Sequence, residues 1–342
     1  MNDLDDKGVR EALARYSIGP VRDISPILSG HINATYRIAT AQGTYILQLL
    51  GAVFNERTVY DMERVTAHLS KKGVLAPRVL HTAEGASFLK SPGGRVWRLT
   101  TFIEGDIYEN LTQDSYAAEA GKVLATFHVA MSDFDAKFLK SKPFLHNIQE
   151  IYESFCAAYE NLLREEPDKV QREYYRYIQE KMASLMLPAD LPTTIIHADP
   201  KISNVVFSGG KGICMIDLDT CMRHTPLVDL GDALRWCAIS EEAFPNAMSL
   251  PQFKYSIEGY RNVEPLSPEM KEYLMQAFAM VTLGLASRFA KDVYHDNYFG
   301  WNPKKYPSRK EHNKARARSL VSLTQDILRK EKEMRDILKS CH

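Results

Sequence analysis

Four side chains between residues 199 and 219 have the types and the spacing that phosphoryl transfer requires. Asp199 precedes Asn204 by five residues, and an apolar strand, a Gly-Gly-Lys-Gly turn and a second strand then lead to Asp217 and Asp219. In kinase-type chemistry one carboxylate takes the proton of the attacking hydroxyl, while an asparagine and another aspartate hold the Mg²⁺ that bridges the nucleotide phosphates. We therefore interpret Asp199 as the catalytic base, next to the acceptor hydroxyl. Asn204 and Asp217 are interpreted as Mg²⁺ ligands, because hard oxygen donors suit this ion.

Polar residues near this motif have more than one interpretation. Asp219 either adds a further carboxylate to the metal site or begins the loop after the second strand. Asp229 and Asp232 lie at the start of a predicted helix, where the helix dipole stabilises carboxylates. One of them also suits a role in bracing the catalytic loop through His197 or backbone amides. His197 is expected to brace the loop by hydrogen bonds, because no second histidine lies at metal-ligand spacing.

The composition is that of a soluble globular protein. The chain has 342 residues, which is long for one core, so two lobes of unequal size are expected. A formal net charge of zero argues against a nucleic-acid partner and against a general attraction to anionic membranes. The N-terminus is acidic without the apolar stretch of a signal peptide, and no apolar run is long enough to span a membrane. We expect a cytoplasmic protein whose five cysteines are free thiols, since none forms a C-x-x-C pair.

The first part of the chain predicts a small antiparallel sheet. A short opening helix is followed by three strand-like runs separated by turn signals, by one helix that ends at Gly73, and by two further strand-like runs. This pattern indicates an N-terminal lobe of residues 1–104. The predicted helices are residues 7–16 and 55–72, and the predicted strands are residues 21–29, 34–40, 44–50, 86–90 and 95–103.

Residues 105–342 read as a larger, mostly helical lobe. Only a short strand at 194–196 and the two strands of the opening motif interrupt the helices. The combination predicts an α+β, bilobal, protein-kinase-like fold, with a nucleotide in the cleft between the lobes because ligand sites favour domain junctions. The long last helix either covers the helical lobe or pairs with another chain. The predicted helices are residues 117–131, 148–164, 170–187, 228–239, 252–260, 268–292 and 309–338.

Residues 28–36 lie between the first two predicted strands, where a phosphate-covering turn belongs. Small and polar residues there allow backbone N–H groups to approach phosphates. Taken alone, the segment contains one glycine and favours an ordinary hairpin. The candidate nucleotide-binding residues of this segment are Ser29, Gly30, His31, Asn33 and Thr35.

These motifs together resemble the aminoglycoside/choline phosphotransferase superfamily. The run H-A-D-P-K-I-S-N-V-V-F followed by M-I-D-L-D-T is similar to the signature motif of that superfamily. The similarity is closer to the bacterial N-acetylhexosamine 1-kinases and covers nearly the whole chain. The segments that carry it are G-H-I-N-x-T-Y at 30–36, Y-I-L-Q at 45–48, I-D-L-D-T at 216–220, D-L-G-D-A-L-R at 229–235 and R-F at 288–289.

The resemblance implies ATP-dependent phosphorylation of the anomeric hydroxyl of GlcNAc or GalNAc, which gives the sugar 1-phosphate. ATP would be the co-substrate and Mg²⁺ the cofactor, with Asp199 as base and Asn204 and Asp217 as metal ligands. The segment 100–104 would be the hinge whose backbone meets adenine. The nucleotide-binding residues expected in this hinge are Thr101, Phe102 and Ile103.

One position departs from the wider superfamily. The third strand there usually carries a Lys or Arg that grips the nucleotide phosphates and pairs with a Glu on the following helix. In this chain the position is Gln48, while Glu63 fits the helical partner by spacing. A neutral amide donates a hydrogen bond but does not neutralise phosphate charge, and charge-assisted bonds are roughly twice as strong. Either Mg²⁺ and loop amides compensate or catalysis is slow; the hexosamine kinases share this Gln, which favours compensation.

Acceptor recognition is expected in residues 287–301, which are dense in polar and aromatic side chains. Aromatic faces suit the apolar face of a pyranose, and charged side chains suit its hydroxyls. The alternative is a helix end packed by aromatic residues with exposed charges. Arg288 matches the family position, and Tyr294 and Tyr298 are the further substrate-binding candidates.

Two other functions stay open at the level of the sequence. The first is phosphorylation of another small alcohol, such as an aminoglycoside, a choline-type amino alcohol or a different sugar; acidic clusters would favour a cationic acceptor, whereas Arg288 and its aromatic neighbours favour a neutral sugar. The second is a nucleotide-binding pseudokinase, which is suggested by Gln48. The intact Asp199, Asn204 and Asp217 argue against the second.

Overall fold

The computed structural model describes residues 6–28, 32–139 and 147–340. The chain divides into two compact units. The N-terminal unit contains residues 1–105 and 135–142, and the C-terminal unit contains residues 106–134 and 143–342. The sequence placed a single boundary after residue 104, whereas in the structure a later segment returns to the first unit.

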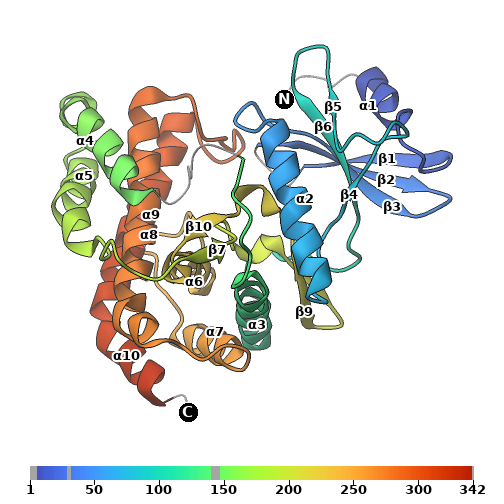
Figure 1. The fold of residues 1–342 in the computed structure, drawn as a ribbon. Helices are drawn as coiled ribbons and strands as arrows, with labels where there is room; N and C mark the ends of the chain where they lie inside the picture. Colours follow the sequence, from blue (N-terminus) through green and yellow to red (C-terminus); the bar gives the residue numbers. More distant parts are fainter. Residues whose placement is uncertain (1–5, 29–31, 140–146, 341–342) are drawn as a thin grey trace. The chain divides into compact units, whose positions relative to one another are not determined.

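An antiparallel sheet forms the centre of the N-terminal unit (Figure 1). Its strand order is β1-β2-β3-β6-β4, and β5 pairs with β6. The three long strands predicted before residue 50 are confirmed, while the strand predicted at 86–90 is reduced to two residues. β4 was not predicted, because two residues are too few to show alternation. The strands are β1 (Val21–Ile27), β2 (Ala34–Thr40), β3 (Thr44–Leu49), β4 (Val79–Leu80), β5 (Leu89–Lys90) and β6 (Val96–Thr101).

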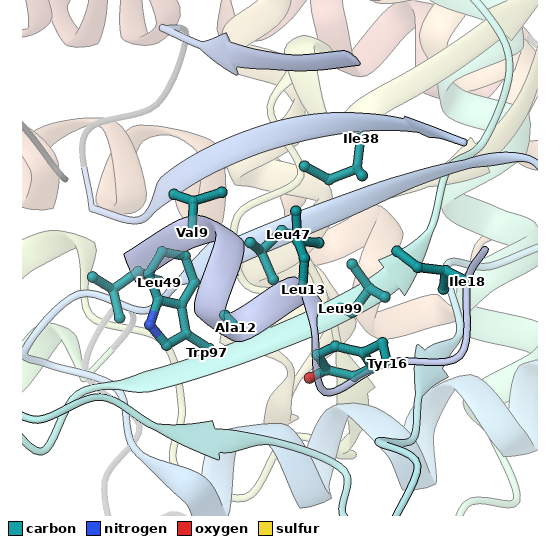
Figure 2. Close-up of a cluster of buried hydrophobic side chains, with 10 residues drawn as sticks. All are labelled: Val9, Ala12, Leu13, Tyr16, Ile18, Ile38, Leu47, Leu49, Trp97 and Leu99. Carbon is teal, nitrogen blue, oxygen red and sulfur yellow. The ribbon is translucent and has the colours of Figure 1, made fainter. Parts of the chain in front are cut away.

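Helix α1 (Asp6–Leu13) covers one face of this sheet. Figure 2 shows Val9 and Leu13 of α1 packed over Ile38, Leu47 and Leu99 of three neighbouring strands. These side chains are almost completely buried, and burying a large aliphatic side chain contributes about 1.5–3 kcal/mol. Because side chains alternate along a strand, the residues next to this cluster face the other side of the sheet.

Helix α2 (Glu56–Lys71) follows β3 and confirms the predicted helix at 55–72. The Asn55 side chain caps its start by accepting the Arg57 amide hydrogen, and Gly73 stops it with a φ of +73°. The helix also explains why residues 135–139 belong to this unit. Asp61 Oδ1 accepts the Leu139 amide hydrogen at 2.7 Å, and a further α2 side chain bonds the carbonyl of residue 137.

The C-terminal unit is mostly helical, as predicted. Two of the predicted helices end in a 3₁₀ turn, at 182–185 and 234–237, and the long helix predicted at 309–338 is wrong, because Lys330 leaves helical geometry and separates two helices. No helix of the described residues has both the length and the apolar character needed to cross a membrane. The helices are α3 (Asp114–Met131), α4 (Ile148–Glu165), α5 (Lys169–Lys181), α6 (Pro226–Ala233), α7 (Leu250–Arg261), α8 (Pro268–His295), α9 (Arg309–Arg329) and α10 (Glu331–Ser340).

Close helix packing fixes the frame of this unit. α3 and α7 approach through Gly121 and Gly259, where a Cβ atom would lie 2.1 Å and 1.9 Å from backbone oxygens of the facing helix. α8 and α9 also pack along each other (Figure 1). The short strands lie on two small ladders: β7 (Thr194–Ile196) pairs with β10 (Met222–His224), and β8 (Val205–Ser208) pairs with β9 (Lys211–Met215). The sequence missed β10.

Candidate active site

The β8–β9 hairpin brings the two candidate metal ligands together. Asn204 ends a 3₁₀ turn directly before β8. One residue, Ile216, separates the end of β9 from Asp217. The Ile216 amide donates to the Asn204 carbonyl at 2.9 Å, which extends the ladder to the level of both side chains. The two strands predicted between Asn204 and Asp217 thus pair as a hairpin, which places both residues at neighbouring strand ends.

The orientation of the Asn204 amide suits a cation. Its Nδ2 donates to the Asp199 carbonyl at 2.8 Å and to Asp199 Oδ2 at 3.2 Å, so Oδ1 is the atom left to face a metal. Asp217 is half-buried and Asp219 is 2% exposed on the adjoining 3₁₀ turn. No group of three or more His, Cys, Asp or Glu side chains among the described residues is placed to hold a metal. The residues present fit Mg²⁺ bound through one amide and one or two carboxylates, with phosphates and water completing its shell.

Left-handed backbone marks the loops of this unit. Among the described residues, the non-glycine residues with positive φ are Ala198, Asp217 and Asp296. Each such residue costs of the order of 1–3 kcal/mol and persists only where the surrounding structure enforces it. The first directly precedes the candidate base, the second is itself a candidate metal ligand, and the third begins the loop of the candidate acceptor segment.

Asp199 has a cationic neighbour that the sequence analysis missed. Lys201 Nζ lies 3.3 Å from Asp199 Oδ2, and the two side chains are 48% and 28% exposed. Burial by itself would raise the pKa of Asp199, but the positive charges of Lys201 and His197 outweigh it and hold that pKa below its ordinary value. Burial likewise lowers the pKa of Lys201, and the charges of Asp199 and Asp217 more than reverse this. Asp199 is therefore kept ionised, as a proton acceptor must be.

Replacing Lys201 by Met should move the acid limb of the kcat/KM profile to higher pH. A general base is active only at pH values above its pKa. Removing the Lys201 charge raises the pKa of Asp199, so the enzyme loses activity at the acid end of its pH range. The measurement is kcat/KM from pH 5 to 9 at saturating Mg²⁺, with Lys201→Arg, which keeps the charge and the wild-type limb, as the control. An unmoved limb in Lys201→Met would show that Asp199 is not the titrating base.

A buried network holds the loop that carries Asp199, the candidate base. Asp229 on α6 is fully buried, and its two oxygens accept the backbone N–H groups of His197 (2.7 Å) and Ala198 (2.8 Å). Its Oδ2 also bonds His128 Nε2 at 2.9 Å, and His128 Nδ1 bonds the Tyr260 hydroxyl at 2.8 Å. This confirms the interpretation that an aspartate of the 229–232 pair braces the loop.

His197 adds a second brace, also as predicted. Its Nε2 bonds the Ile216 carbonyl at 2.8 Å, and its Nδ1 accepts the Asp199 amide hydrogen at 3.2 Å. The catalytic loop is thus tied both to α6 and to the end of the hairpin. Asp232 has a different partner, because it forms an ion pair with Arg235 at 2.6 Å.

The nucleotide-binding candidates are all in the N-terminal unit. Ser29, Gly30 and His31 lie outside the described residues. Asn33 Oδ1 accepts the Gly51 amide hydrogen at 2.9 Å and anchors the end of the turn to the segment after β3.

The hinge candidates follow the end of β6. The Thr101 hydroxyl oxygen accepts the Arg78 amide hydrogen at 2.9 Å, and the Phe102 amide donates to the Thr44 carbonyl at 3.3 Å. These groups are therefore used within the sheet, and Ile103 follows half-buried.

Gln48 and Glu63 do not bond each other. The two oxygens of Glu63 bond His81 and Ser87, so the helix residue does have a partner, but not on β3. Gln48 instead bonds Arg98 on the next strand. The neighbouring cation is thus on β6 and not on β3, and only the sheet register reveals it.

The acceptor candidates lie on the last turns of α8 and on the loop that follows it. The Arg288 guanidinium lies over the rings of Tyr298 (5.6 Å) and Phe299 (5.4 Å), and Tyr298 is 52% exposed. Tyr294 is half-buried and its ring contacts the neighbouring His295 ring. Arg288 and Tyr298 are thus brought together, whereas no interaction found in the described part of the chain joins Tyr294 to them.

Asp292, another residue that the sequence analysis missed, shapes this loop. It is 3% exposed, and its carboxylate accepts the backbone N–H groups of residues 297, 298 and 299 at 2.9–3.1 Å. Asn313 Nδ2 of α9 donates to the same carboxylate at 2.9 Å. The signal available in the sequence was an aspartate at the end of the helix predicted at 268–292, since a carboxylate in the last turn of a helix is disfavoured by the dipole.

A sheet followed by a helical unit, with a hairpin that carries candidate metal ligands next to a candidate base, is the arrangement expected of a small-molecule phosphotransferase. Comparison with known sequences agrees, because a profile described as the phosphotransferase enzyme family (APH) matches residues 23–266. The chain belongs to this family. A homoserine kinase of Mesorhizobium japonicum is 29% identical over 287 residues, covering 83% of this chain and 84% of that protein, and one of Agrobacterium fabrum is 26% identical over 84% of both chains.

Solved structures show the same fold. A microcompartment-associated aminopropanol kinase aligns with a TM-score of 0.67 at 16% identity, covering 96% of this chain and 98% of its own. The amicoumacin kinase hAmiN aligns with a TM-score of 0.66 at 13% identity, covering 93% of both chains. A choline kinase of Cryptosporidium parvum Iowa II aligns with a TM-score of 0.58 at 14% identity, covering 92% and 90%. The predicted α+β, protein-kinase-like fold is therefore confirmed.

Proposed function

We propose that the protein is an ATP- and Mg²⁺-dependent kinase for a small molecule that carries an alcohol group. The acceptor oxygen attacks the γ-phosphorus of ATP, the bond from that phosphorus to the β–γ bridging oxygen breaks, the hydroxyl proton passes to Asp199, and ADP leaves. The observation that carries this proposal is the arrangement of Asn204 and Asp217 at the end of one hairpin, with Asp199 bonded to Asn204 from the braced loop before it. Mg²⁺ held by Asn204 and Asp217, with Asp219 beside them, would neutralise phosphate charge.

An N-acetylhexosamine is the first candidate acceptor. The motif resemblance over most of the chain supports it, and so does the packing of Arg288 on α8 against Tyr298 and Phe299 of the following loop. An exposed aromatic ring packs on the apolar face of a pyranose, and a guanidinium donates to its hydroxyl or acetyl oxygens.

A hydroxylated amino acid is the second candidate acceptor. Relatives named homoserine kinase that are 25–29% identical to this chain over most of its length favour it. The chemistry of the loop also allows it, because an Arg288 guanidinium binds an α-carboxylate in a bidentate manner. The two candidate acceptors differ in charge, since the sugar is neutral and the amino acid is a zwitterion. An assay with both compounds distinguishes them directly.

An ATP-consumption assay across a panel of acceptors tests the proposal. The panel contains GlcNAc, GalNAc, unmodified hexoses, L-homoserine, choline and an aminoglycoside, each with Mg²⁺ and ATP. Turnover with an N-acetylhexosamine alone supports the first candidate, and turnover with homoserine alone supports the second. Silence with every acceptor, together with measurable Mg-ATP binding, would overturn the enzyme proposal in favour of a nucleotide-binding pseudokinase.

Replacing Arg288 by Ala should raise the KM of the acceptor about ten- to a hundredfold and change the KM of ATP much less. A lost hydrogen bond to a charged group costs about 1.5–3 kcal/mol, and 1.4 kcal/mol is a factor of ten. Paired steady-state titrations measure both constants. The control is Arg176→Ala on α5, a surface arginine whose partner is Glu173; equal rises in both KM values for Arg288→Ala would refute a role in acceptor binding.

A further inference from the structure

Three side chains lie side by side across the central strands of the N-terminal sheet. The register pairs Thr35 of β2 with Gln48 of β3, and Gln48 with Arg98 of β6. In each strand the residues on either side face α1: Figure 2 shows Leu47, Leu49, Trp97 and Leu99 in that cluster. Because side chains alternate, Thr35, Gln48 and Arg98 share the opposite face of the sheet.

The hydrogen bonds of this row fix the orientation of the Gln48 amide. Arg98 donates from Nε (3.0 Å) and from Nη2 (2.7 Å) to the single oxygen Oε1 of Gln48. Gln48 Nε2 donates to the Thr35 hydroxyl at 3.3 Å. The oxygen of the amide therefore points to β6 and its NH₂ group points to β2, the strand that follows the candidate phosphate-covering turn. Of the two hydrogens on this nitrogen, Thr35 takes one.

Arg98 also places a positive charge next to Gln48, on the neighbouring strand. The guanidinium belongs to one of the largest buried side chains, with 1% of the residue exposed. A charge in such a position is screened much less than a surface charge. A charged donor strengthens a hydrogen bond to the amide oxygen, and it polarises the amide so that the N–H groups become better donors.

We propose that Gln48 and Arg98 together hold the nucleotide phosphates in this protein. Gln48 donates an N–H to a phosphate oxygen, and Arg98 is a positioning residue that orients this amide and supplies the charge from the neighbouring strand. The proposal rests on the proposed kinase function, since it requires ATP as the ligand. It explains how a sheet with a neutral residue at position 48 binds a polyanionic ligand, because the cation lies on β6, the strand next to β3.

The test compares the affinity for Mg-ATP with the affinity for adenosine, which lacks phosphates, in the full chain by calorimetry and competition. Gln48→Met and Arg98→Met are expected to weaken Mg-ATP binding about tenfold or more and to leave adenosine binding within twofold. The matched control is Arg95→Met, because Arg95 bonds the backbone carbonyl of Leu50 and not Gln48. It is expected to change both affinities to the same small extent.

A double-variant experiment keeps the proposal testable if Arg98→Met folds poorly. Gln48→Lys removes the oxygen that accepts both Arg98 hydrogen bonds and sets two cations side by side, so it should disturb the row and weaken Mg-ATP binding, although it restores the residue type found in the wider superfamily. Gln48→Lys with Arg98→Gln returns the row to one cation and one amide, and should bind Mg-ATP within a few-fold of the wild type. Equal losses for Mg-ATP and adenosine in Gln48→Met, or a double variant weaker than Gln48→Lys, would overturn the proposal.

The failure of this inference is distinguishable from the failure of the proposed function. A wild-type chain that does not bind Mg-ATP refutes the kinase function. If the wild-type chain binds Mg-ATP and the variants weaken Mg-ATP and adenosine binding equally, only the role of Gln48 and Arg98 is refuted.

Discussion

Replacing Asp199 by Asn lowers kcat by about two to four orders of magnitude and leaves the affinity for Mg-ATP within a few-fold of the wild type. This is the expected loss when a general base is removed. The amide has nearly the same shape as the carboxylate and still accepts from Asn204 Nδ2, which lies 3.2 Å from Oδ2. The loop geometry should therefore persist while the proton acceptor is lost. Single-turnover phosphoryl transfer and nucleotide titration measure the two quantities separately.

Asp199→Ala should be equally inactive, although it also removes the partner of Lys201. Asp336→Asn is the matched control, because Asp336 is a surface carboxylate on α10 that is 61% exposed and pairs only with Lys339 in the described part of the chain. Near-normal kcat in Asp199→Asn would show that another group takes the proton. A large loss of Mg-ATP affinity would instead indicate that Asp199 acts mainly through the metal.

The fold could be predicted from the sequence wherever an element is long and its apolar pattern regular. The strand at 34–40 alternates in apolar character, the strand at 44–49 is an apolar run between turn signals, and the helix after them has a polar cap and a terminal glycine. The failures have physical causes. β4 and β10 have two and three residues, so they form only because a neighbouring strand offers hydrogen bonds. The break at Lys330 is not encoded by a Pro or Gly and depends on tertiary contacts such as the bond from its Nζ to the Met248 carbonyl.

The candidate site shows the same division. The motif predicted the hairpin and the bracing aspartate, because Asp199, Asn204 and Asp217 are ordered along a short local segment. Arg98 could not be found in this way. It lies 50 residues from Gln48 in sequence, and only the register of β3 and β6 makes the two residues neighbours. A resemblance carried by motifs therefore identifies groups of residues that are close in sequence. A charged neighbour on another strand is found only from the structure.

Asp229→Ala should destabilise the folded protein by about 3–5 kcal/mol and should also lower kcat at temperatures where the variant is still folded. Removing one member of a buried charged network leaves its partners unpaired, and this produces losses of that size. Here the unpaired groups are the amides of His197 and Ala198 and the Nε2 atom of His128. Ala198 holds a φ of 66°, which is strained for a residue other than glycine, so the catalytic loop loses the anchor that enforces its shape.

The pH dependence of this effect has a definite sign. Burial raises the pKa of Asp229, but the hydrogen bond and the charge of His128 outweigh it, so the folded-state pKa lies below the ordinary aspartate value. The stabilisation is therefore complete at pH values above about 4 and is lost as the pH falls through the folded-state pKa. The difference in unfolding free energy between the wild type and Asp229→Ala should shrink over that interval.

Urea unfolding followed at several pH values, together with kcat, separates a local role of Asp229 from a general one. Asp326→Ala is the matched control, because Asp326 is also a buried carboxylate that accepts a backbone N–H, from Met248 at 2.9 Å, and lies on α9. Both variants should lose stability, but only Asp229→Ala should lose kcat at a temperature where both are folded. Equal kcat in the two variants would mean that the contacts of Asp229 stabilise the unit without fixing the catalytic loop. A loss of kcat in Asp229→Ala alone would show that Asp229 holds the backbone that positions Asp199 next to the substrate.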